Sequence, residues 1–268
     1  MRANKKRNMP TSISPIKRGG LLLLSLLIVI FIWAGLANLF GLPAFILPGP
    51  GRVWARFLQS LSEGQIVYHF LATLLEVVAG LFLGGVTATI LGYLLAKSPK
   101  TEKIIGPYMA ASQSVPIVAI APLLVIWFGT GIFSKILICS LTVFFPILIN
   151  TVVGIREVPQ DLRELMRSLD ASKAQTLKKL EIPAALPIFL GGLRVGATLS
   201  VIGAVVGELV GADRGLGFLI NVGRGQYDTA LVFVAVIALV VMAMSLYGIV
   251  LLVENRFLSW QKWRQESL

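Results

Sequence analysis

Residues 163–183 read RELMRSLDASKAQTLKKLEIP, a strongly charged stretch inside a chain of 268 residues that is 56% hydrophobic. The apolar residues near its start follow the i, i+3, i+4, i+7 spacing of one helical face, at Leu162, Leu165, Met166 and Leu169. Ser172 with Gln175 three residues later is typical of a capping box, so we expect a second helix to begin there and to end at Pro183. The stretch therefore predicts two short amphipathic helices, too polar to cross a membrane.

The apolar stripe of such helices must be buried on a lipid surface or in a partner protein. Acidic residues are interleaved with the basic ones, at Asp161, Glu164 and Asp170. Because anionic lipid repels carboxylates, this mixture favours a protein partner.

Outside this stretch the chain consists largely of apolar segments, at 21–40, 67–96, 104–128, 132–155, 186–211 and 229–253. About 20 apolar residues are enough to cross ~30 Å of hydrocarbon, so we predict an all-α, polytopic membrane protein with about six transmembrane helices. The first segment is longer than the apolar core of a signal peptide and lacks an A-x-A cleavage site, so we expect it to be retained.

Most of the 24 Lys and Arg residues lie in segments 1–20, 97–103, 156–181 and 254–268. The positive-inside rule then predicts that both termini and the charged stretch are cytoplasmic. This placement accounts for the net charge of +11 without nucleic acid. The chain has one histidine, one cysteine and no G-x-x-x-x-G-K-[ST] motif, so we expect no metal, no cofactor, no ATP site and no enzymatic activity.

Polar residues inside the spans are candidates for a translocation path, because intramembrane polar groups are costly. They are Glu76, Ser112, Gln113, Ser114, Asn150 and Glu208. The segment 104–128 contains three prolines, which predict a broken span whose freed carbonyls need partners. Each candidate has a structural alternative: the amide and hydroxyl groups can satisfy broken backbone, Glu76 can bond between helices, and Glu208 can form an interfacial ion pair.

The charged stretch resembles the cytoplasmic loop of the transmembrane subunits of binding-protein-dependent ABC importers, with the pattern E-A-A-x3-G-x9-I-x-L-P. The matching positions carry Glu164, Leu165, Met166, Asp170, Leu180, Ile182 and Pro183. The spacing agrees throughout, whereas both alanines, the glycine, the isoleucine and the leucine are replaced. The stretches LPGPGRVW, APLLVIWFGTGIFSKI and GELVGADRGLGFLI also look like the nitrate, sulfonate and taurine branch, and the resemblance covers about residues 45–255.

The resemblance implies a type I ABC importer permease fold in a bacterial inner membrane, with a basic cytoplasmic amino terminus at 1–20, a single permease domain at 21–268 and a coupling loop at about 156–183. Its implied partners are a second copy of the chain, cytoplasmic ATP-binding subunits, an extracytoplasmic solute-binding protein and membrane lipid. Glu164 would pair with a basic group of the ATPase, while Leu165, Met166 and Leu169 would fill its groove. Asp170 puts the turn geometry in question, because the glycine of the pattern permits positive φ.

The solute is predicted from Glu76, which stands where many sulfonate and taurine relatives have arginine. A carboxylate facing the path disfavours an anionic solute. Together with GELVGADRGLGFLI, this favours riboflavin or a related vitamin or pyrimidine precursor, with an aliphatic sulfonate, taurine or nitrate as the alternative. Two rival classes are a secondary transporter and a membrane scaffold. Six spans without an obvious repeat disfavour a secondary transporter, and a scaffold leaves the prolines of 104–128 unexplained.

Overall fold

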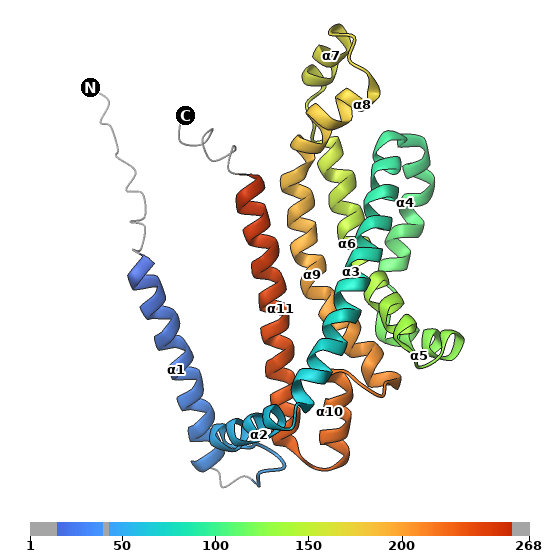
Figure 1. Ribbon diagram of the computed structural model, residues 1–268. Helices are drawn as coiled ribbons and strands as arrows, with labels where there is room; N and C mark the ends of the chain where they lie inside the picture. Colours follow the sequence, from blue (N-terminus) through green and yellow to red (C-terminus); the bar gives the residue numbers. More distant parts are fainter. Residues whose placement is uncertain (1–14, 40–42, 259–268) are drawn as a thin grey trace, which may run out of the picture.

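A computed structural model describes residues 15–39 and 43–258 of the chain, and within these ranges all regular secondary structure is helical (Figure 1). The elements are α1 (Pro15–Leu39), α2 (Pro50–Ser62), α3 (Gln65–Lys97), α4 (Pro99–Gln113), α5 (Ile117–Phe128), α6 (Ile132–Arg156), α7 (Gln160–Ser168), α8 (Lys173–Thr176), the π-helical turn η1 (Leu177–Glu181), α9 (Ile182–Gly211), α10 (Leu216–Gly225) and α11 (Thr229–Phe257). The predicted all-α class is confirmed. Residues 1–14 of the expected basic amino terminus lie outside the described residues.

Five of the six predicted apolar segments are helical throughout their described residues, and the segment 104–128 is helical except at residues 114–116. In the described part of the chain, four helices are long and apolar enough to cross a membrane, at Gln65–Lys97, Ile132–Arg156, Lys173–Gly211 and Thr229–Phe257. Two shorter apolar helices, Leu27–Leu39 and Ile117–Phe128, accompany them. The segment 104–128 is divided between α4 and α5, and the chain leaves the helix just before Pro116, as its prolines predict.

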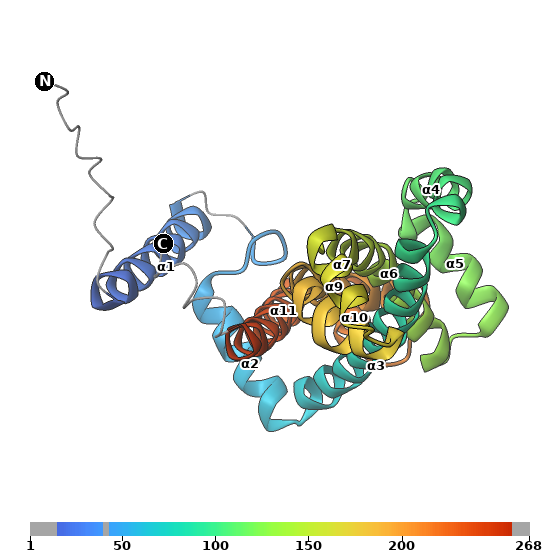
Figure 2. The same ribbon diagram turned by 90° about the horizontal axis from the view of Figure 1, so that it is seen from above.

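The centre of the bundle is α6, which packs between α3 and α9 (Figures 1 and 2). Glycines allow this close packing. A Cβ atom at Gly84 would lie 2.5 Å from the carbonyl oxygen of Ser140 on α6, and one at Gly203 would lie 2.9 Å from the Cα of Cys139. The three helices therefore meet backbone to backbone, as small residues permit in membrane proteins.

Helix α1 stands away from this central bundle in both views (Figures 1 and 2). Its described contacts with the rest of the chain include Trp33, whose ring stacks on Phe233 at a centroid distance of 5.4 Å and whose Nε1–H donates to the carbonyl of Pro48 at 3.1 Å. The beginning of α1 and the end of α11 point toward the same end of the molecule as α7 and α8 (Figure 1). The arrangement is the one that an even number of membrane crossings would give.

Candidate functional site

The charged stretch forms the tip of the molecule, beyond the cytoplasmic-side ends of α3 and α6 in the predicted orientation (Figure 1). On α7, Leu162 and Leu165 are 42% and 53% exposed and Met166 is half-buried, and the C-capping residue Leu169 is 67% exposed. The Glu164 side chain is exposed as well, and it has no ion-pair partner among the residues that the structure describes. The candidate docking residues thus form an apolar surface with a free carboxylate beside it.

Helix α7 ends in a Schellman motif, in which Ala171 N–H donates to the carbonyl of Met166 and Asp170 N–H to that of Arg167, both at 3.0 Å. Asp170 has a φ of 48°, the left-handed conformation that favours glycine. Asp170 therefore adopts a left-handed conformation, which the glycine of the family pattern at this position would adopt without strain.

The expected capping box is present: Gln175 N–H donates to Ser172 Oγ at 3.3 Å, and Ser172 N–H donates to Gln175 Oε1 at 2.8 Å. The expectation that Pro183 ends this helix is wrong, because α8, η1 and α9 form one uninterrupted helix, Lys173–Gly211. In η1 the Ile182 N–H donates to the carbonyl of Leu177, five residues back. This widened turn directly precedes Pro183, and the local change to five-residue bonding lets the helix continue past a residue that has no N–H to donate.

A buried carboxylate that the sequence did not single out ties the charged stretch to the bundle. The Glu181 side chain is 1% exposed and accepts bonds from Lys97 Nζ, from Arg163 Nη1 at 2.7 Å and from Tyr93 Oη at 3.3 Å. Arg163 also donates through Nη2 to the carbonyl of Ile155 at 2.6 Å. Glu181 therefore joins α7 and η1 to the end of α3, and through Arg163 to α6. In the sequence, Glu181 is distinguished only as an acidic residue at the variable position of I-x-L-P in the family pattern.

Two of the candidate path residues meet at the opposite end of the bundle. Glu208 is fully buried, and its carboxylate accepts from Thr73 Oγ1 at 2.7 Å and from Gly217 N–H at 2.5 Å. Glu76 is 2% exposed and lies within hydrogen-bonding reach of Glu208, while its Oε2 atom has no partner among the described residues. A Cβ at Gly215, in the loop before α10, would overlap Oε1 of Glu208, and one at Gly217, in the first turn of α10, would lie 2.8 Å from its Cβ. The loop and the start of α10 therefore close tightly on this side chain.

The other candidates lie on separate parts of the fold. Ser112 and Gln113 belong to the last turn of α4, and Ser114 follows at the break before α5. Asn150 is half-buried on α6, where its Nδ2 donates to the carbonyl of Pro146 at 2.8 Å, and it packs against Gly192 of α9. This bond to a carbonyl of α6 corresponds to the structural alternative given for Asn150 from the sequence, in which its amide satisfies a backbone group. Among the described residues, no group of three or more His, Cys, Asp or Glu could hold a metal.

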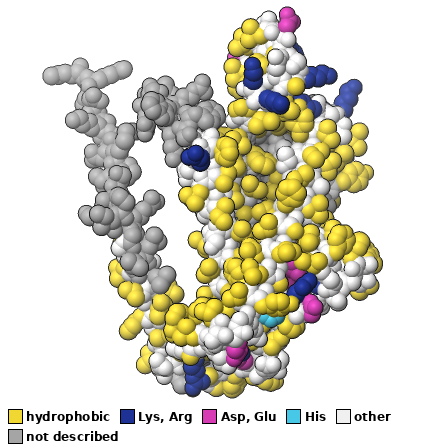
Figure 3. Space-filling view, in the orientation of Figure 1, with side chains coloured by type: hydrophobic (Ala, Val, Ile, Leu, Met, Phe, Trp, Pro, Cys, Tyr) yellow, Lys and Arg dark blue, Asp and Glu magenta, His cyan; other side chains and the backbone are white. Residues whose placement is uncertain are grey.

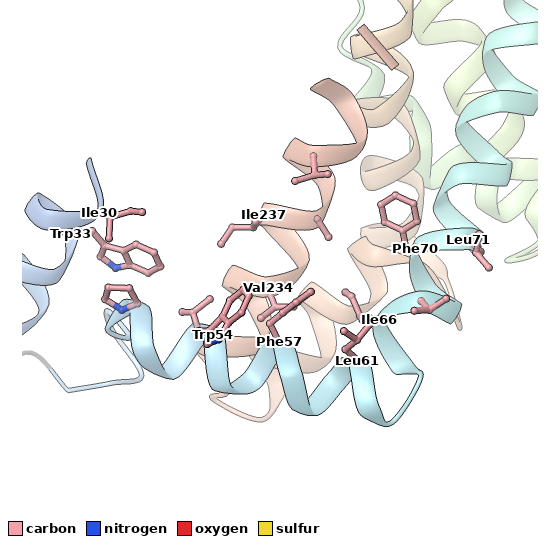
Figure 4. A pocket seen from close by; sticks show the side chains of 15 residues that line it. Ile30, Trp33, Trp54, Phe57, Leu61, Ile66, Phe70, Leu71, Val234 and Ile237 are labelled. Carbon is pink, nitrogen blue, oxygen red and sulfur yellow. The ribbon is translucent and has the colours of Figure 1, made fainter. Parts of the chain in front are cut away.

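A groove of about 610 Å³ lies between α1, α2, α3 and α11 (Figure 4). Its walls carry Trp33, Trp54, Phe57, Phe70 and Val234 among other apolar side chains. A polar solute needs a few converging polar groups in its site, so this groove suits hydrocarbon rather than a solute.

The chain matches the model of the family described as binding-protein-dependent transport system inner membrane component over residues 80–259. It is 45% identical over 237 residues to the riboflavin transport system permease protein RibX of Chloroflexus aurantiacus, covering 88% of each chain. It is 36% identical to the formylaminopyrimidine transport permease protein ThiX of Halalkalibacterium halodurans, over 88% of this chain and 94% of that one. A structure of the inward-facing MetNI methionine ABC transporter shares the fold, with a TM-score of 0.60 at 19% identity over 70% of this chain and 94% of that one.

Proposed function

The chain belongs to the family of binding-protein-dependent transport system inner membrane components and is the permease subunit of an ABC importer, and from this premise we propose that it imports riboflavin or a related vitamin or pyrimidine precursor. The observation that carries the choice of solute is the 45% identity to a riboflavin permease over 88% of both chains. The second relative, a formylaminopyrimidine permease, transports a heterocycle as well.

Charge supports a solute without a sulfonate group. Glu76 and Glu208 place two carboxyl groups in the interior of the bundle, and a nearby anion would be repelled by them. Lys135, a buried cation of the same region, donates to the carbonyl of Thr130 and lies near both carboxyl groups, so it offsets part of this repulsion. Ser112, Gln113, Ser114 and Asn150 complete the proposed path at its break and on α6.

The proposed coupling mechanism begins at α7. Leu165, Met166 and Leu169 fill a groove of the ATPase, and Glu164 pairs with a basic group there. Leu180, Ile182 and Pro183 continue from η1 into α9, so a movement of the docked tip is carried into this span. Glu181 passes the same movement to α3 through Lys97.

The proposed assembly has two copies of this chain, two cytoplasmic ATP-binding subunits, an extracytoplasmic solute-binding protein and surrounding lipid. Both termini lie in the cytoplasm, with a single permease domain at 21–268 behind the basic residues 1–20. The distribution of Lys and Arg supports this orientation, and in Figure 3 these side chains gather around the end that carries α7 and α8.

The test is uptake of labelled riboflavin, a pyrimidine precursor, taurine and an alkanesulfonate by cells that carry this chain with its neighbouring ATPase and binding-protein genes. Glu164→Lys should abolish ATP-dependent uptake while the protein still inserts, because the reversed charge repels the basic group of the ATPase. Glu157→Lys, at another exposed acid of the same loop, is the matched control and should keep uptake. Taurine or sulfonate uptake instead of flavin uptake would overturn the solute, and uptake surviving Glu164→Lys would overturn the coupling role.

Glu76 has its own test, because its path role competes with a purely structural one. Glu76→Gln should change the apparent affinity for the solute while the ATPase still co-purifies. An unchanged affinity together with a lower melting temperature would assign Glu76 to helix packing alone.

A further inference from the structure

A polar pocket of about 460 Å³ opens between the end of α3, α7 and the start of α8. Unlike the groove of Figure 4, it is lined by charged side chains. They are Lys97, Arg163, Arg167, Lys173 and Glu181. Its volume lies within the ~300–1,000 Å³ typical of small-ligand sites.

The charges of the pocket do not balance. Lys97 and Arg163 share the single carboxylate of Glu181 at its base. Arg167 and Lys173 are exposed and have no acidic partner among residues 15–39 and 43–258. Four cations thus surround one anion, so the pocket carries an excess of positive charge that attracts a further anion.

The arrangement of donors defines the chemistry of that anion. Arg167 offers a planar fork of N–H donors, and Lys173 offers a rotatable ammonium group. Two cations on neighbouring elements suit a tetrahedral group with several acceptor oxygens, as a phosphate provides. The buried Glu181 carboxylate at the base turns Lys97 and Arg163 inward and leaves the outer half of the pocket to the ligand.

We propose that this pocket binds a phosphate-bearing anion, supplied either by a free phosphate or phosphate ester of the cytoplasm or by a phospholipid headgroup. Bound there, the anion connects Arg167 of α7 to Lys173 of α8 and braces both against the end of α3. Since α7 is the proposed docking helix, the anion regulates coupling by restraining the movement of this tip. The regulatory part rests on the proposed function, whereas the binding part does not.

The binding experiment uses the full chain, purified in a non-ionic detergent and titrated calorimetrically with inorganic pyrophosphate at fixed ionic strength. The variant Arg167→Gln/Lys173→Gln should weaken binding about tenfold or more, because two charged donors are lost. Lys178→Gln/Lys179→Gln removes the same charge from exposed residues of η1 that do not line the pocket, and it should change the affinity by less than about twofold. If the double variant is not monodisperse, each single substitution should still weaken binding severalfold.

The source of the phosphate is distinguished by a second arm in lipid nanodiscs. In neutral phosphatidylcholine, pyrophosphate should bind as in detergent. In phosphatidylglycerol, a headgroup supplied by the lipid would compete with pyrophosphate and weaken its apparent binding. Native mass spectrometry should then detect phosphatidylglycerol retained by the wild-type chain but not by Arg167→Gln/Lys173→Gln. A cytoplasmic source predicts the same pyrophosphate affinity in both lipids.

Equal weakening by both double variants would show an unspecific charge effect and overturn the site, as would the absence of pyrophosphate binding to the wild-type chain. Loss of ATPase co-purification in Arg167→Gln/Lys173→Gln without any pyrophosphate binding would mean that ATPase carboxylates fill the pocket, which also overturns the proposal. The titration contains neither ATPase nor solute, so a failure of the uptake test leaves its outcome unaffected.

Discussion

Replacing Glu181 by glutamine should uncouple ATP hydrolysis from transport. The substitution keeps the size of the side chain but removes the charge that holds Lys97 and Arg163 together at the base of the charged tip. The link from α7 and η1 to α3 is then weakened, while the apolar docking surface of α7 is left intact.

The cost follows from burial. Removing one partner of a fully buried ion pair costs about 3–5 kcal/mol. Here Glu181 is 1% exposed, but the side chains of Lys97 and Arg163 are 39% and 26% exposed and reach water. Screening therefore lowers the expected loss to about 2 kcal/mol. A loss of this size shifts the ratio of docked to undocked tip by ~30-fold.

The assay compares solute imported with ATP hydrolysed, in proteoliposomes that contain the assembled transporter. For Glu181→Gln the ratio should fall by up to ~30-fold, and the apparent melting temperature should fall by about 4–8 °C. Glu157→Gln removes an exposed acid at the end of α6 and should leave both unchanged. A Glu181→Gln transporter with the wild-type ratio and a melting temperature within about 1 °C of wild type would refute the reasoning.

Three further outcomes are expected. Asp170→Gly should raise the melting temperature by relieving a left-handed conformation that costs about 1 kcal/mol, whereas Asp170→Val should lower it. A higher melting temperature for the valine variant than for the glycine variant would contradict the left-handed conformation at this turn. Gly84→Ala should destabilise the fold by about 1–3 kcal/mol, because its Cβ would lie 2.5 Å from a carbonyl oxygen of α6. In the same melts Gly85→Ala, whose Cβ would lie 3.6 Å from its nearest neighbour, should be at least as stable as wild type, because alanine favours a helix over glycine. Glu208→Ala should expose the loop between α9 and α10 to limited proteolysis, since two hydrogen-bond donors lose their acceptor, and Glu208→Gln should do so less; an unchanged cleavage pattern in both would mean that the loop is held by other contacts.

Local rules predicted much of the fold. The apolar segments became helices, and Ser172 and Gln175 formed their capping box. Pro116 lies at the division of the segment 104–128, whereas Pro107 and Pro122 lie inside α4 and α5. Each of these features depends on residues within one or two helical turns. The error at Pro183 has the same origin, because the rule that a proline ends a helix ignores the widened turn that precedes it.

The site was less predictable because its contacts are distant in sequence. Lys97 and Glu181 are 84 positions apart, and Thr73 and Glu208 are 135 apart. No periodicity relates such residues, since only the packing of α3 against η1 and α9 brings them together. The sequence identified Glu76 and Glu208 as separate costly charges, but their contact depends on a helix packing that no local pattern encodes.

The uninterrupted helix Lys173–Gly211 gives the molecule a mechanical lever. Its long arm is α9, whose 30 residues span ~45 Å at ~1.5 Å per residue. A tilt of about 5° at the docked end would move the far end by ~4 Å, which is longer than any hydrogen bond that Glu208 makes there. If α7 docks on the ATPase as proposed, a small tilt at that end would become a displacement large enough to open or close the opposite face of the bundle.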